Sequence, residues 1–163
     1  MSDINHNNGI AMNIKNYPYN ELPKVGDHGK AKRKGSADTI IPGFLNWKND
    51  SHPAWRSGDY WEYSCHNSRT GQDYIFRFHY VNCGNYYEID ILEYPDCMGK
   101  SENSPSLHWL NSARGGKKIC VNSGQEPRTL EQAKSLSESW AVYVARYIWT
   151  GMSIDYQISH HIW

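Results

Sequence analysis

The segment from Thr129 to Gly151 places the strongest restriction on what this chain can fold into. Thr129 is followed three residues later by Gln132, which is the pattern of a helix capping box. Gly151 fits the position after a helix, where the backbone turns left-handed at little cost. We expect one long helix of about 30 Å along one face of a small sheet. Its apolar residues recur at helical spacing: Leu130, Ala133, Leu136, Trp140, Tyr143 or Val144, and Tyr147.

Three segments before this helix alternate in character as strands do. They are residues 60–66, 73–81 and 86–93, separated by short polar turns. In the third segment we expect Glu88 and Asp90 to face solvent, opposite the side chains of Tyr87, Ile89 and Ile91. The pattern predicts an α+β fold in which an antiparallel β-meander packs against the long C-terminal helix.

The composition changes near residue 38. Residues 1–38 are rich in Asn, Lys, Gly and Pro and predict a flexible N-terminal arm, followed by a single domain over residues 39–163. A basic cluster at residues 30–34 is more typical of a solvated linker than of a docking patch. Residues 152–163 predict an edge strand or a docking arm, and His160 and His161 are expected to be exposed rather than metal ligands.

The bulk composition excludes several function classes. Lys plus Arg and Asp plus Glu number 17 each, so nothing global favours nucleic acid or an anionic membrane as a partner. There is no long apolar run and no signal peptide, so we expect a cytoplasmic protein with reduced thiols. No phosphate loop, HExxH or CxxC motif is present, and we expect neither a metal nor a cofactor. The four cysteines are Cys65, Cys83, Cys97 and Cys120.

Cys120 is the main candidate for chemistry. Three basic residues lie within six positions before it, and nearby positive charge favours the reactive thiolate. The glycine turn before it and the polar loop after it predict an accessible rim. On spacing alone, the favoured alternative is a small core residue in a buried strand. A cysteine enzyme also needs a base, and the sequence leaves four candidates open: His52, His66, His79 and His108.

The order of these pieces resembles the ubiquitin-conjugating enzyme family. The similarity lies in YIFRFHY, YYEIDILEYP, LHWLN, KKICV and TLEQAKSLSESWAVYVARYIWTG, over residues 73–151. The compact bacterial members found in antiphage defence operons are the most similar. The resemblance implies that Cys120 carries a ubiquitin-like protein as a thioester and transfers it to an amine. The implied partners are that protein, a ubiquitin-activating-type enzyme and a protein target.

The resemblance also implies roles for two further residues. Asn111 is similar to the Asn of the family's His-Pro-Asn turn, whose amide stabilises the oxyanion, and His108 is similar to its His. The resemblance further implies that no strong base is needed if the attacking amine is desolvated. The chain departs from the family because Trp109 stands where the proline follows the histidine, and Glu126 replaces a usual tryptophan.

Two other functions remain open from the sequence. One is a catalytically inactive scaffold of the same fold that binds a partner protein through exposed aromatic side chains. The other is a small phage or mobile-element protein whose aromatic β-sheet binds a ligand or a capsid partner. An exposed Cys120 sulfur favours the enzyme, a buried one favours the scaffold, and a closed β-sandwich favours the third function.

Overall fold

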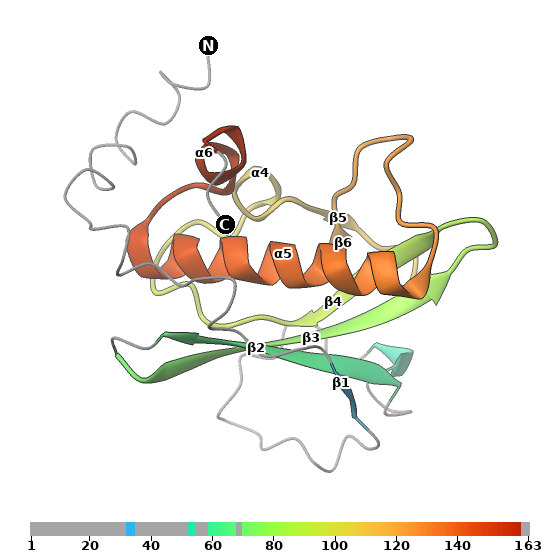
Figure 1. Ribbon diagram of the computed structural model, residues 1–163, viewed down its shortest axis with the longest axis horizontal. Coiled ribbons are helices and arrows are strands. Elements are labelled where there is room, and N and C mark those ends of the chain that lie inside the picture. The colour runs from blue at the N-terminus through green and yellow to red at the C-terminus, as the bar shows by residue number, and fades with distance from the viewer. Residues whose placement is uncertain (1–31, 35–51, 55–58, 68–69, 161–163) are drawn as a thin grey trace.

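The fold is a single antiparallel sheet with a long helix across one face (Figure 1). The computed structural model describes residues 32–34, 52–54, 59–67 and 70–160. Within them the strand order is β1-β2-β3-β4-β6-β5. The strands are β1 (Lys32–Lys34), β2 (Tyr60–Asn67), β3 (Gln72–Asn82), β4 (Tyr87–Glu93), β5 (Trp109–Asn111) and β6 (Lys117–Ile119). The helices that lie wholly within the described residues are α4 (Ser104–Leu107), α5 (Leu130–Thr150) and α6 (Ile154–Ser159).

The predicted meander is confirmed as β2, β3 and β4, and α5 contacts all three strands. Aromatic side chains of β3 fill the layer between the sheet and the helix. Phe76 and Phe78 are fully buried, and the Trp140 ring on α5 meets each edge-on at centroid distances of 6.0 and 5.9 Å. Such edge-to-face pairs stabilise a core by about 1 kcal/mol beyond the burial of their area. The α+β class expected from the sequence is therefore correct.

The ends of α5 are those that the sequence predicts. The Thr129 hydroxyl accepts a hydrogen bond from the backbone N–H of Gln132 at 3.1 Å. The Gln132 side chain in turn accepts from the backbone N–H of Arg128 at 2.8 Å. Gly151 ends the helix with φ at 80°, a left-handed conformation that costs glycine little. These caps fix where the helix begins and ends.

Two local expectations are wrong. Asp90 does not face solvent but is 0% exposed, because residues from other parts of the chain cover that side of β4 and hydrogen-bond to it. Residues 152–160 do not form the expected edge strand, because Ser153 caps a short helix, α6, that contacts α5. Helical spacing of the buried residues Ile154 and Gln157 explains this outcome.

Most of the expected N-terminal arm lies outside the described residues, so the arm and its boundary near residue 38 stay predictions. The short strand β1 is described, and it pairs antiparallel with β2. Of the two tail histidines, His160 is exposed, and position 161 lies outside the described residues. In the described part of the chain, no helix combines the length and the apolar character needed to cross a membrane.

Candidate functional site

Strands β5 and β6 bring Cys120 next to His108. Trp109 pairs with Ile119, and the backbone N–H of Cys120 donates to the carbonyl of His108 at 2.8 Å. The Ile119 side chain is buried and anchors β6, whereas Cys120, one residue later, is exposed. The accessible position expected for Cys120 is confirmed, and the alternative of a buried core cysteine is wrong.

A hollow of about 250 Å³ lies beside the Cys120 thiol. It contains an ion pair between Nε2 of His108 and a carboxylate oxygen of Asp155 at 2.7 Å. The pair joins two elements that lie side by side, because His108 follows α4 and Asp155 is in the first turn of α6 (Figure 1). The lining residues are Ser104, Pro105, His108, Trp109, Cys120 and Asp155.

His108 is held in an uncommon backbone conformation. Its φ of 54° and ψ of 55° are left-handed, which costs a residue with a Cβ roughly 1 kcal/mol. The position is fixed from both sides, because the His108 N–H caps α4 by donating to Ser104 and its carbonyl accepts from Cys120. Strained positions of this kind persist where neighbouring structure determines them, and they cluster at functional sites.

Asp155 was not among the residues expected from the sequence. Its helix is fixed because Ile154 and Gln157, on the two sides of Asp155, are 2% and 0% exposed. The Gln157 amide also donates to the carbonyls of Tyr143 on α5, at 2.9 Å, and Met152, at 3.1 Å. A helical period in residues 154–157 was the available signal, but a segment of six residues is too short for that period to be distinctive.

Asn111 does not join this group. It pairs with Lys117, three residues before Cys120, which corresponds to about 10 Å along the strands. It does not line the hollow beside Cys120. The residues after His108 form the extended strand β5 rather than one tight turn, and this separation explains the difference. The expected role of Asn111 at the oxyanion therefore lacks the contact it requires in this structure.

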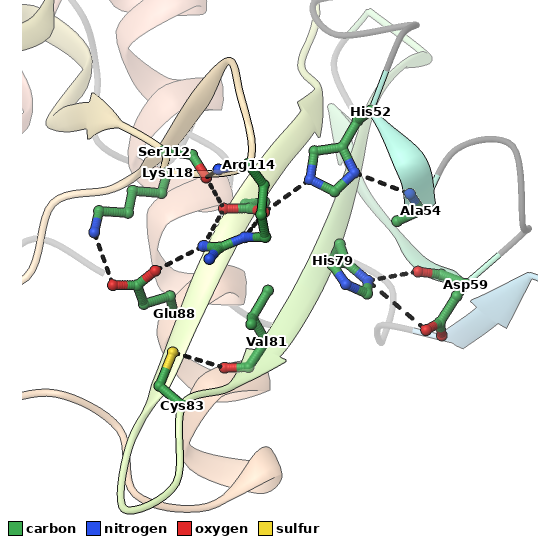
Figure 2. Close-up of polar contacts among 11 residues, drawn as sticks. His52, Ala54, Asp59, His79, Val81, Cys83, Glu88, Ser112, Arg114 and Lys118 are labelled. Carbon is green, nitrogen blue, oxygen red and sulfur yellow. Dashed lines mark hydrogen bonds and ion pairs between the residues drawn. The ribbon is translucent and has the colours of Figure 1, made fainter.

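A second polar cluster lies on the sheet face opposite α5 (Figure 2). Asp90 accepts hydrogen bonds from Nε2 of His52 at 2.8 Å and the Ser112 hydroxyl at 2.8 Å. Arg114 donates to both Asp90 oxygens, from Nε at 2.5 Å and from Nη2 at 2.9 Å. Nη2 also reaches Glu88 at 2.6 Å. Because Ser112 and Arg114 belong to the turn between β5 and β6, this cluster fastens that turn to β4.

The folded state stabilises the ionised forms of the two acidic residues in this cluster. Burial raises the pKa of Asp90, but hydrogen bonds from Arg114, His52 and Ser112 outweigh burial and hold the pKa below its ordinary value. Hydrogen bonds from Lys118 and Arg114 lower the pKa of Glu88. Both carboxylates are therefore ionised at neutral pH. Asp90 at the centre of the cluster is inaccessible to a substrate. The cluster therefore fixes the position of the antiparallel pair formed by β5 and β6, which we call the β5–β6 ribbon.

The other candidate bases lie away from the hollow. Nδ1 of His52 accepts from the backbone N–H of Ala54 at 3.0 Å, so its proton is on Nε2, bonded to Asp90. His79 donates from Nδ1 to the carbonyl of Asp59 at 2.7 Å. His66 forms an exposed ion pair on β2 and β3, with Asp73. Of the four histidines, His108 alone shares the hollow with Cys120.

The site thus combines an exposed thiol with a histidine–carboxylate pair. These are the groups that acyl transfer through a covalent cysteine intermediate uses. Among the described residues, no group of three or more acidic, histidine or cysteine side chains is arranged to hold a metal ion. No protein-family model, curated protein or solved structure matches the chain. The family therefore stays a prediction from the order of the sequence motifs.

Proposed function

We propose that the protein is a ubiquitin-conjugating-like carrier, which accepts a ubiquitin-like protein as a thioester on Cys120 and transfers it to an amine. The observation that carries the proposal is the exposed Cys120 beside the His108–Asp155 pair, in a hollow at the end of β6. The order of a meander, then the cysteine, then a long capped helix agrees with the resemblance.

The proposed reaction has two acyl transfers. In the first, Sγ of Cys120 attacks the C-terminal carbonyl of a ubiquitin-like protein that is held as a thioester on an activating enzyme. A new S–C bond forms and the enzyme's thiolate leaves. In the second, an amine nitrogen attacks the same carbonyl, the bond to Cys120 breaks, and the amine gives up a proton as the amide forms. Each step exchanges one acyl bond for another and needs no oxidant or metal.

The wider setting follows from this reaction. Activation of the ubiquitin-like protein consumes ATP, which places the proposed activity in the cytoplasm. The proposed partners are the ubiquitin-like protein, a ubiquitin-activating-type enzyme and a protein target. By resemblance, the proposed role is in bacterial antiphage defence.

The two alternatives are less well supported by the described residues. An inactive scaffold does not require an exposed thiol beside a histidine–carboxylate pair. A ligand-binding β-sandwich requires two packed sheets, whereas the described strands form one sheet whose apolar face is covered by α5. The aromatic residues of β3 are core residues under that helix rather than a binding surface.

The proposal is tested by trapping the covalent intermediate. The full chain is incubated with ATP, the cognate activating enzyme and its ubiquitin-like partner, and is then run on a non-reducing gel. We expect an adduct that is removed by thiol and is absent in Cys120→Ala. The matched control is Cys83→Ala, which removes a partly buried cysteine and should leave the adduct unchanged. An adduct that persists in Cys120→Ala would overturn the proposal.

A further inference from the structure

The hollow beside Cys120 holds a base that the sequence resemblance does not imply. The resemblance predicts a site in which desolvation alone frees the attacking amine of its proton. The structure instead places the imidazole of His108 in the same hollow as the thiol, with Nε2 at 2.7 Å from the Asp155 carboxylate. A histidine in contact with a carboxylate and next to a nucleophile has the arrangement used for proton transfer.

The contact with Asp155 determines which ring nitrogen is available. A carboxylate accepts hydrogen bonds only, so in the neutral ring we assign the proton to Nε2 of His108, which lies 2.7 Å from the Asp155 carboxylate. In the neutral ring the lone pair is then on Nδ1, which is the nitrogen that can accept a proton. A nearby carboxylate also stabilises the imidazolium that forms when the proton arrives. Asp155 thereby fixes both the tautomer and the orientation of the base.

Both members of the pair are placed before any substrate binds. His108 is held in its left-handed conformation by hydrogen bonds on its N–H and its carbonyl. Asp155 lies between the buried Ile154 and Gln157, which fix α6 against the rest of the fold. Glycine would adopt the left-handed backbone of position 108 at lower cost. This left-handed position is the C-cap of α4, and the residue that occupies it is a histidine that lines the hollow.

We propose that His108 is the general base for the attacking amine and that Asp155 is the residue that positions it; this inference rests on the proposed carrier function. The acceptor class is a primary alkyl amine, such as a lysine side chain, which is protonated at neutral pH. The ammonium first gives one proton to His108, which passes it to solvent, and the free amine nitrogen then forms its bond to the acyl carbon. The C–S bond breaks, and the second amine proton leaves with the Cys120 sulfur, so that the products are an amide and the free thiol. The half-exposed Asp155 carboxylate, 53% accessible, also favours a cationic acceptor at the rim of the hollow.

The test separates the deprotonation of the amine from the formation of the thioester. Cys120 is loaded by exchange with a synthetic peptide thioester ending in Gly-Gly, so no activating enzyme is needed. Discharge of the loaded protein is then timed with free lysine and with hydroxylamine, which is largely unprotonated at neutral pH and needs no base. The variants are His108→Asn, which tolerates the left-handed backbone, and Asp155→Asn.

A matched control comes from a second exposed histidine–carboxylate contact. Asp73 lies 2.7 Å from His66 in a similar pair on β2 and β3, away from the hollow. Asp73→Asn therefore breaks the same kind of contact without touching the proposed base. His108→Gly adds a second readout, since free imidazole added to the solution should restore lysine discharge if the missing group is a base.

Each variant is loaded to completion at Cys120, and its rate of lysine discharge is expressed relative to its own rate of hydroxylamine discharge. Lysine discharge should fall on the order of 100-fold in His108→Asn and about tenfold in Asp155→Asn, and should be unchanged in Asp73→Asn. Equal lysine discharge by wild type, His108→Asn and Asp155→Asn would overturn the inference and leave the carrier function standing. Failure of Cys120 to load by any route would overturn both.

Discussion

At the scale of single residues, the candidate chemistry depends on differences in solvent exposure among the four cysteines. Cys65 and Cys97 are 1% and 0% exposed, Cys83 is partly buried, and Cys120 is exposed. Burial raises the pKa of the Cys65 thiol to about 12, so that its reactive thiolate is scarce at neutral pH. The local sequence singles out Cys120 by its basic neighbours and flanking turns, and the fold shows how far each of the other three cysteines is buried.

This difference predicts the order in which the thiols react. With a limiting amount of iodoacetamide near neutral pH, we expect Cys120 to be alkylated first and Cys65 last. Peptide mass mapping at successive times measures the order. Labelling of Cys65 before Cys120 would contradict the assigned burial, and the same experiment in Cys120→Ala shows how fast Cys83 reacts by itself.

His108 gives a second prediction at this scale. Replacement by glycine relieves a left-handed backbone strain of about 1 kcal/mol, and it removes a partly exposed ion pair that contributes less than about 1 kcal/mol. We therefore expect the free energy of unfolding of His108→Gly to stay within about 1 kcal/mol of wild type, as measured by urea denaturation. A loss of more than about 2 kcal/mol would show that the side chain is needed for packing.

At the scale of elements, the β5–β6 ribbon carries the site and is held to β4 by the cluster around Asp90. The ribbon is short, with three residues in each strand, so pairing alone fixes it weakly. Arg114 and Ser112 in its turn bond to Asp90, and Lys118 on β6 bonds to Glu88 at 2.8 Å. The position of Cys120 therefore depends on charges on the opposite side of the ribbon from α5.

Removal of the central charge should destabilise the fold in a pH-dependent way. Asp90→Asn leaves part of a buried charge network uncompensated, and we expect it to cost about 3 kcal/mol at neutral pH. Because the folded pKa of Asp90 is lowered, its stabilisation is complete above the unfolded value of about 4 and is lost as pH falls through the folded value. The difference between wild type and Asp90→Asn should therefore shrink on acidification.

Urea denaturation of both proteins over a series of pH values measures this difference. The control is Asp73→Asn, whose exposed ion pair should contribute less than about 1 kcal/mol at any pH. A difference between wild type and Asp90→Asn that stays constant, or grows, toward acid pH would show that the Asp90 charge is not what fastens the ribbon.

At the scale of the whole molecule, regular patterns predicted the fold well, and contacts between distant segments could not be predicted. The period of α5 and its capping residues are local properties, as is the alternation in β3, so the sequence displays them directly. Asp90 occupies a position that the alternation in β4 assigns to the solvent-facing side. It is buried because His52 and the turn containing Ser112, which are distant in the sequence, contact it in the fold.

The candidate site shows the same limit. Cys120 and His108 were expected separately, and the pairing of β5 with β6 places them together. Asp155 comes from α6, and nothing in its local sequence indicates a contact with a histidine on another element. Asn111 is near His108 in the sequence, but the extended strand between them carries it away from Cys120. Sequence spacing therefore predicted the exposed position of the candidate nucleophile, Cys120, but not the contact of Asp155 with His108.

The central claim is that Cys120 carries an acyl group in the living cell. Cys120→Ser tests it most directly, because an oxyester on serine is more stable than a thioester and allows the intermediate to be isolated. The variant is purified from cells that naturally make the protein, and peptides containing residue 120 are identified by mass spectrometry. We predict the C-terminal residues of a ubiquitin-like protein attached at position 120, whereas an unmodified residue 120, or the same group attached only at another position, would contradict the account.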